Sequence, residues 1–209
     1  MVLIVHIYGG MERFKIAFLS GCWGLPEGCL EDSSCELVGT WVQTPELNFN
    51  FEIWGQGEEL IDTQHYIALG DQILNFQKKI CSTFNLGLSF DNKMGSDSVI
   101  ACAVRPQPGT EYGVDHYFNK GGIGKGSNIY DPPNYALSNG FSSIEDGNLY
   151  CSYTLEPEYT LNSQYFNLEQ NQFHILLATG MVDHNGEVRK HSKKAASADV
   201  FHLPDNKSK

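Results

Sequence analysis

The sequence is poor in positive charge. Its 14 Lys and Arg residues stand against 25 Asp and Glu, which gives a formal net charge of −11 over 209 residues. Proteins that bind nucleic acid need clustered Lys and Arg side chains for phosphate contacts, so this balance argues against a nucleic-acid partner. Charged residues make up only 19% of the chain, below the usual level of about 25%.

Long apolar runs are also missing. The most apolar stretches, residues 2–5 and 175–182, are far shorter than the roughly 20 residues that a helix needs to cross a bilayer. We therefore expect no membrane span in this chain.

Several catalytic and metal-binding motifs are absent. The sequence has no G-x-S-x-G motif, no histidine pair at positions i and i+4, and no C-x-x-C. These absences argue against a nucleophile elbow, a helical zinc site, and a zinc-ribbon or thioredoxin-type site.

Six cysteines are present, with Cys22, Cys29 and Cys35 close together in the sequence. This number favours an oxidising compartment and two or three disulfides, of which the cluster forms one with a connectivity left open. Residues 1–21 resemble a weak signal peptide with a split apolar region, the alternative being an ordinary N-terminal segment or a misplaced start codon. We expect a secreted, extracytoplasmic or lumenal location.

The dominant pattern is that of short β-strands. In residues 47–54, apolar and polar side chains alternate with period two, which predicts a strand with one buried face. Glycine is abundant, at 21 residues, and turn signals separate the strand candidates. This spacing predicts an antiparallel sandwich or barrel. The other predicted strands are residues 39–43, 65–69, 98–104, 112–119, 148–154, 173–179 and 200–203.

One segment departs from the β pattern. In residues 71–86, Ile73, Phe76, Ile80 and Phe84 follow one another at helical spacing. We predict an amphipathic, helix-like insertion here.

A set of motifs stands in a fixed order along the chain, namely GCWGLPEGCLEDSSCELVGTW, YIALG, GLSFDNKMGSDSVIAC, HYFN, DGNLYC, FHILLATG and HSKKAAS. Together these motifs resemble the DOMON domain, and specifically its ferric-chelate reductase and stromal-cell-derived-receptor branch. The resemblance covers residues 21–203, and we expect one domain over 22–203 with a polar tail at 204–209.

This resemblance implies an immunoglobulin-like antiparallel β-sandwich. Several members of the family bind b-type haem through a methionine and a histidine, which correspond here to Met94 and His191. The nearby Arg189 and Lys190 would then face the haem propionates. The alternative interpretations are that Met94 fills a gap in the packing and that His191 belongs to a solvated basic loop.

The resemblance also implies a disulfide between Cys102 and Cys151, the alternative being two small buried thiols. His116 is interpreted as a core histidine with satisfied hydrogen bonds rather than as a ligand. His174 leads a predicted buried strand.

In the family pattern, the YIALG and GLSFDNKMG motifs form one continuous run, which residues 71–86 interrupt here. The segment is a true surface insertion, a helix that covers a sheet edge, or translated non-coding sequence from a faulty gene model. A true insertion would alter the approach to Met94.

The function that the resemblance implies is electron transfer through haem b. Related proteins attach such a module to a membrane dihaem cytochrome, so the chain would need that cytochrome or another redox partner and would not be a complete enzyme. A haem-free extracellular recognition or receptor-accessory module is the main alternative. A pocket for a sugar or a catecholamine-like ligand is the third.

Overall fold

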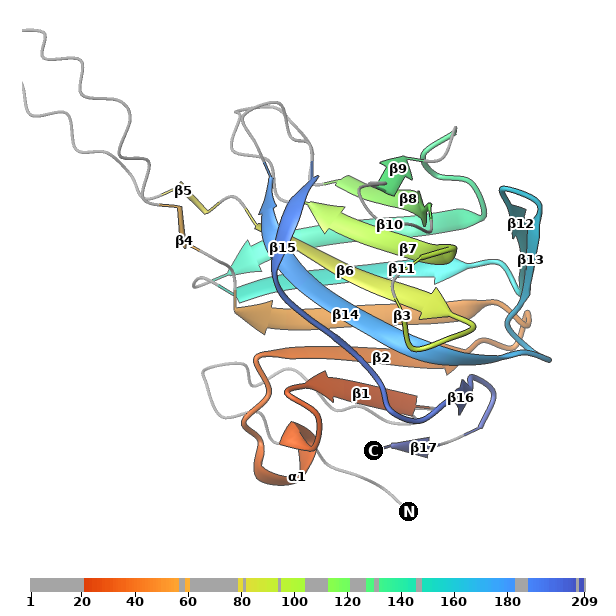
Figure 1. Cartoon of the computed structure of the whole chain (residues 1–209), viewed down its shortest axis with the longest axis horizontal. Helices are drawn as coiled ribbons and strands as arrows, with labels where there is room; N and C mark the ends of the chain where they lie inside the picture. The colour runs from red at the N-terminus through yellow and green to blue at the C-terminus, as the bar shows by residue number, and fades with distance from the viewer. Residues whose placement is uncertain are drawn as a thin grey trace, which may run out of the picture.

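The structure is a computed structural model, and it is built almost entirely of β-strands (Figure 1). Its one described helix is the short α1 (Cys29–Asp32). The residues that the structure describes are 21–56, 59–60, 79–80, 82–93, 95–103, 113–120, 127–129, 132–145, 148–182, 188–205 and 207–208.

The first sheet has six strands. Neighbouring strands are antiparallel except at one edge, where β17 runs parallel to β1. This pairing connects the C-terminal end of the chain to the first described strand. In spatial order the strands are β10 (Leu137–Glu145), β11 (Asn148–Leu155), β3 (Phe49–Gln56), β2 (Leu37–Gln43), β1 (Gly21–Leu25) and β17 (Lys207–Ser208).

The second sheet is antiparallel and stacks on the first, as Figure 1 shows. Its strands lie in the order β15 (Val188–Ala196), β14 (Gln172–Val182), β6 (Ser82–Ser89), β7 (Asp97–Ala103), β8 (Gly113–Asn119) and β9 (Ser127–Ile129), with β16 (Phe201–His202) paired to β14. Two hairpins complete the fold: β12 (Glu158–Leu161) with β13 (Gln164–Asn167), and β4 (Glu59–Leu60) with β5 (Lys79–Ile80).

Apolar and polar side chains alternate along the strands, and the apolar ones form the core between the two sheets. On β3, Phe49, Phe51 and Ile53 are fully buried, as the period-two pattern predicts. Phe173, Ile175 and Leu177 of β14 enter the same core from the second sheet. The predicted antiparallel β-sandwich is therefore confirmed, because each sheet buries one apolar face against the other.

Two disulfides are present among the described cysteines. Cys102 on β7 is bonded to Cys151 on β11, so this bridge joins the two sheets through the core. The pair is the one that the family resemblance implied. Cys29 is bonded to Cys35, and Cys22 is a free, buried thiol. Two disulfides fit an oxidising environment.

The prediction of a helix over residues 71–86 is wrong for the C-terminal part of that segment. Residues 79–80 form β5 and residues 82–86 are the first half of β6, while residues 71–78 and 81 lie outside the described residues. Phe84 is fully buried in the inter-sheet core, and Leu86 and Leu88 follow it at period two. Alternation from Phe84 onward places three apolar side chains on the core face of a strand, and this burial outweighs the helical spacing of Phe84 with Ile80.

Within the described part of the chain, no helix is long and apolar enough to cross a membrane.

Candidate functional site

The outer face of the second sheet carries the histidines of interest. Phe173, Ile175 and Leu177 of β14 point into the core, so His174, Leu176, Ala178 and Gly180 point the other way. Directly opposite residues of an antiparallel pair share a face, so this outer face extends across β15, β6, β7 and β8. Near its centre, the small residues Ala178, Gly87 and Ala101 alternate with the larger Leu176, Asn85 and Val99.

His191 lies on this outer face at the edge of the sheet, in β15 opposite Gly180. Its side chain is half-buried, and its Nδ1 atom is buried without a hydrogen-bond partner. Burial, and to a smaller extent the positive charge of Lys194, lowers the pKa of His191. The imidazole is therefore neutral at pH 7, which is the form that ligates metals.

The other predicted haem-site residues lie wholly or partly outside the described residues. Met94 lies outside the described residues. Arg189 and Lys190 belong to β15 by their backbone, and their side chains lie outside the described part. Among the described residues, no group of three or more His, Cys, Asp or Glu side chains could hold a metal ion.

The residues on either side of Met94 are described, and they belong to the turn between β6 and β7. The Lys93 carbonyl accepts a hydrogen bond from Ser89 Oγ at 3.4 Å. The Gly95 amide donates to Asp97 Oδ2 at 2.6 Å. Lys93 and Gly95 are thus held at the end of β6 and the start of β7.

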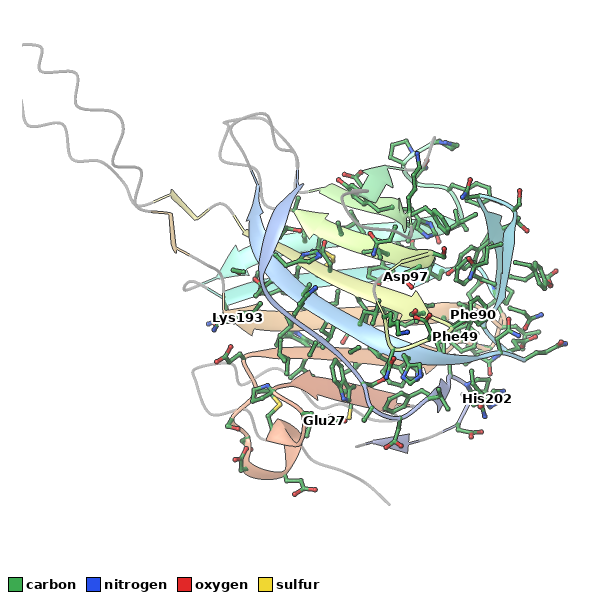
Figure 2. All side chains as sticks on the ribbon, viewed as in Figure 1. Glu27, Phe49, Phe90, Asp97, Lys193 and His202 are labelled. Carbon is green, nitrogen blue, oxygen red and sulfur yellow. A yellow bond between two sulfur atoms is a disulfide. The ribbon has the colours of Figure 1, made fainter. Side chains whose placement is uncertain are left out.

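The strand register separates this turn from His191. Ser89 pairs with His174, whereas Thr83 pairs with Gly180, which in turn pairs with His191. Six residues along β14 separate the two levels, which is about 20 Å at the usual rise of a strand. Figure 2 shows the same separation, with Lys193 near one end of the sandwich and Phe90 near the other.

His174 lies at the end of the face where the turn between β6 and β7 is found. It pairs with Ser89 and is half-buried. Its Nδ1 atom donates to the Ser197 carbonyl at 2.8 Å, so in the neutral ring the Nε2 atom carries the lone pair. A backbone carbonyl that orients one ring nitrogen in this way is typical of histidines that ligate through the other.

Two buried polar groups add to the chemistry of this face. Asn85 accepts a hydrogen bond from Thr83 Oγ1 at 3.2 Å, and its Nδ2 atom is buried without a partner. Asp97 is fully buried, and its Oδ1 atom also lacks a partner. Burial raises the pKa of Asp97, while hydrogen bonds from the Gly95 amide and Asn119 Nδ2 act in the opposite direction.

His116 lies in the core and forms a closed hydrogen-bond network. Its Nδ1 atom donates to the Tyr135 carbonyl at 2.7 Å, so its Nε2 atom accepts from Ser98 Oγ at 2.8 Å. Tyr159 Oη lies 2.8 Å from Ser98 Oγ and completes the chain. Burial lowers the pKa of His116 to about 4. The interpretation of His116 as a satisfied core histidine is confirmed.

Sequence reasoning gave His174 no site role and missed Asn85. Alternation in FHILLATG could have placed His174 on the face opposite Phe173 and Ile175. Asn85 stood within the supposed helical insertion, so no strand pattern was applied to it.

The fold and this face define a β-sandwich with two disulfides and a neutral, partly exposed imidazole. No protein-family model matches the chain. The chain is 27% identical over 176 residues to a Drosophila melanogaster protein named as a ferric-chelate reductase 1 homolog. The match covers 83% of this chain and 22% of that relative, so the chain spans about a fifth of the relative's length. The similarity relates the chain to part of a reductase-like protein.

Proposed function

We propose that this chain is a DOMON-type module that binds b-type haem and transfers electrons outside the cytoplasm, with Met94 and His191 as axial ligands. The observation that carries the proposal is the neutral, half-buried imidazole of His191, whose Nδ1 atom has no partner. The similarity to a ferric-chelate reductase homolog supports it. Residues 22–203 would form the module, and a membrane dihaem cytochrome or another redox partner would exchange electrons with it.

Of the four predicted haem-site side chains, His191 is the one that the structure describes, and it would supply a nitrogen ligand. Met94 would supply a thioether, and Arg189 and Lys190 would supply positive charge for the propionates. A haem held by two protein ligands supplies one-electron chemistry and leaves no axial position for a substrate.

A haem-free recognition module is the second candidate function, and the strand register favours it. The turn that holds Lys93 and Gly95 lies about 20 Å along the strands from the level of His191. For both ligands to reach one iron, this turn would have to approach β15 across the outer face.

Haem titration of the purified chain separates the two functions. If the module binds haem, the wild-type chain acquires a stoichiometric Soret band with the spectrum of methionine and histidine ligation. Met94→Ala and His191→Ala each lose that spectrum, because each removes one axial ligand. Absorption and magnetic circular dichroism spectra measured on both oxidation states provide the readout.

His202→Ala is the matched control, because both ring nitrogens of His202 already have partners, Asp205 Oδ1 at 3.1 Å and the Glu169 carbonyl at 2.6 Å. This variant is expected to leave the spectrum unchanged. Loss of the spectrum in His174→Ala with retention in His191→Ala would transfer the ligand role to His174. A wild-type chain that stays colourless when offered haem would overturn the haem proposal and leave the recognition module.

A further inference from the structure

The outer face of the first sheet, opposite to the proposed haem face, carries a row of three aromatic rings. The rings belong to Trp54 on β3, Tyr150 on β11 and Phe141 on β10. The ring centroids of Trp54 and Tyr150 are 5.8 Å apart, and those of Tyr150 and Phe141 are 6.1 Å apart. The rings are tilted by 35° and 53°, so they form an uneven surface rather than a flat stack.

This part of the face is open to solvent. Phe141, on the edge strand β10, is 53% exposed, and Trp54 and Tyr150 are partly exposed. Toward β1 the same face is covered, since Val38, Thr40 and Cys22 are all buried. The rings therefore occupy the accessible half of the sheet.

Glu52 lies among these rings. It is opposite Ser152 in the strand register and accepts a hydrogen bond from Tyr150 Oη at 3.3 Å. Its carboxylate is about half-buried, and burial raises the pKa of Glu52. Among the described residues no Lys, Arg or His pairs with it, although carboxylates that lose their water are ordinarily paired with a cation.

We propose that Glu52 and the rings of Trp54, Tyr150 and Phe141 form a binding site for a small organic cation that carries an alkylated ammonium group. The carboxylate supplies the opposite charge, and the negative faces of the aromatic rings attract the methylated head within about 6 Å of their centroids. The net charge of −11 raises the local concentration of cations and repels anionic ligands.

A neutral sugar fits this site less well than a cation does. Sugars stack on aromatic rings and donate hydrogen bonds to carboxylates, but they leave the charge of Glu52 without compensation. The rings are also tilted relative to one another, whereas stacking of a sugar favours a flat platform. Aromatic faces beside a carboxylate that has no cationic partner among the described residues favour an alkylammonium group over a neutral sugar.

Titration with choline tests the proposal. Intrinsic fluorescence suits the measurement, because Trp23 and Trp41 are almost fully buried and Trp54 is the partly exposed indole among the described residues. We expect a saturable change with choline chloride and none with sodium chloride at equal ionic strength. The uncharged isostere 3,3-dimethylbutan-1-ol should bind at least about tenfold more weakly, because it lacks the charge that Glu52 and the rings attract.

Glu52→Gln removes the charge, keeps the shape and retains an acceptor for Tyr150, so it should weaken choline binding by about tenfold or more. Phe141→Ala should weaken it severalfold at little cost in stability, since the side chain is exposed. The matched control is Glu158→Gln, because Glu158 accepts a hydrogen bond from Tyr165 on the separate β12–β13 hairpin. This control should leave the affinity unchanged.

Three outcomes would overturn the proposal. Equal affinities for choline and its uncharged isostere would reduce the site to an apolar patch. Binding of glucose or cellobiose without binding of choline would make it a sugar site. Wild-type affinity of Glu52→Gln, with its fold verified by circular dichroism, would remove the carboxylate from the site. None of these outcomes depends on whether the opposite sheet binds haem.

Discussion

Replacement of both Cys102 and Cys151 by alanine is expected to lower the free energy of unfolding by about 4 kcal/mol. The bridge spans 49 residues of sequence, so its removal returns a large amount of loop entropy to the unfolded chain. Both half-cystines are completely buried between the sheets, where they connect β7 to β11. Urea denaturation under non-reducing conditions, compared with the wild type, measures the loss.

The Cys29–Cys35 bridge provides the internal comparison. It spans only 6 residues, so the corresponding double alanine variant should lose about 2 kcal/mol. Its sulfurs also cover the β1 strand, where a Cβ at Gly24 would lie 2.6 Å from both of them. If the two double variants lost equal stability, loop entropy would not be the main contribution of the Cys102–Cys151 bridge.

Acidification from pH 7 to pH 4 is expected to cost about 3 kcal/mol of stability through His116 alone. The pKa of this side chain is about 4 in the folded protein and 6.5 in a model peptide. The unfolded chain therefore takes up a proton between these values and the folded chain does not. The contribution is fully present above pH 6.5 and is lost as the pH falls toward 4.

The physical reason is the closed network around the ring. The Nδ1 atom already donates to the Tyr135 carbonyl, and the Nε2 atom accepts from Ser98. Protonation of Nε2 would make it a donor, so the Ser98 hydroxyl would have to turn toward Tyr159, and it would bury a positive charge in the core.

Other groups also titrate between pH 7 and pH 4. Comparison of the wild type with His116→Gln therefore isolates the contribution of His116 to the pH dependence of stability. The raised pKa values of Asp97 and Glu52 act in the opposite direction, and the lowered pKa of His191 acts in the same direction as that of His116. The stability difference between wild type and variant, measured by urea denaturation at pH 7 and pH 4, should shrink by about 3 kcal/mol. If the stability difference between wild type and variant were the same at pH 7 and pH 4, the pKa of His116 would not be lowered in the folded protein.

The proposed haem and cation sites lie on the outer faces of opposite sheets. His191 belongs to the second sheet and Glu52 to the first, and the Cys102–Cys151 bridge connects the sheets between them. If both proposals hold, the module would bind haem on one side and an organic cation on the other.

The sequence by itself determined the β-sandwich class. Alternation in strands such as β3 and β11 is a local property, because neighbouring side chains point to opposite faces whatever the rest of the chain does. The acidic balance and the six cysteines likewise set the kinds of partner and compartment to expect. The pairing of Cys102 with Cys151 came from the family resemblance, since spacing alone leaves cysteine connectivity open.

Only the tertiary structure decided the rest. Phe84 fits a helical stripe as well as a strand, and burial between two sheets determines which of the two forms. The separation between His191 and the turn that holds Lys93 and Gly95 depends on the register of β6, β14 and β15. The meeting of Glu52 with Tyr150, 98 residues apart, depends on the pairing of β3 with β11. Such non-local pairings arise from the packing of the whole sandwich, and no short segment of the sequence contains them.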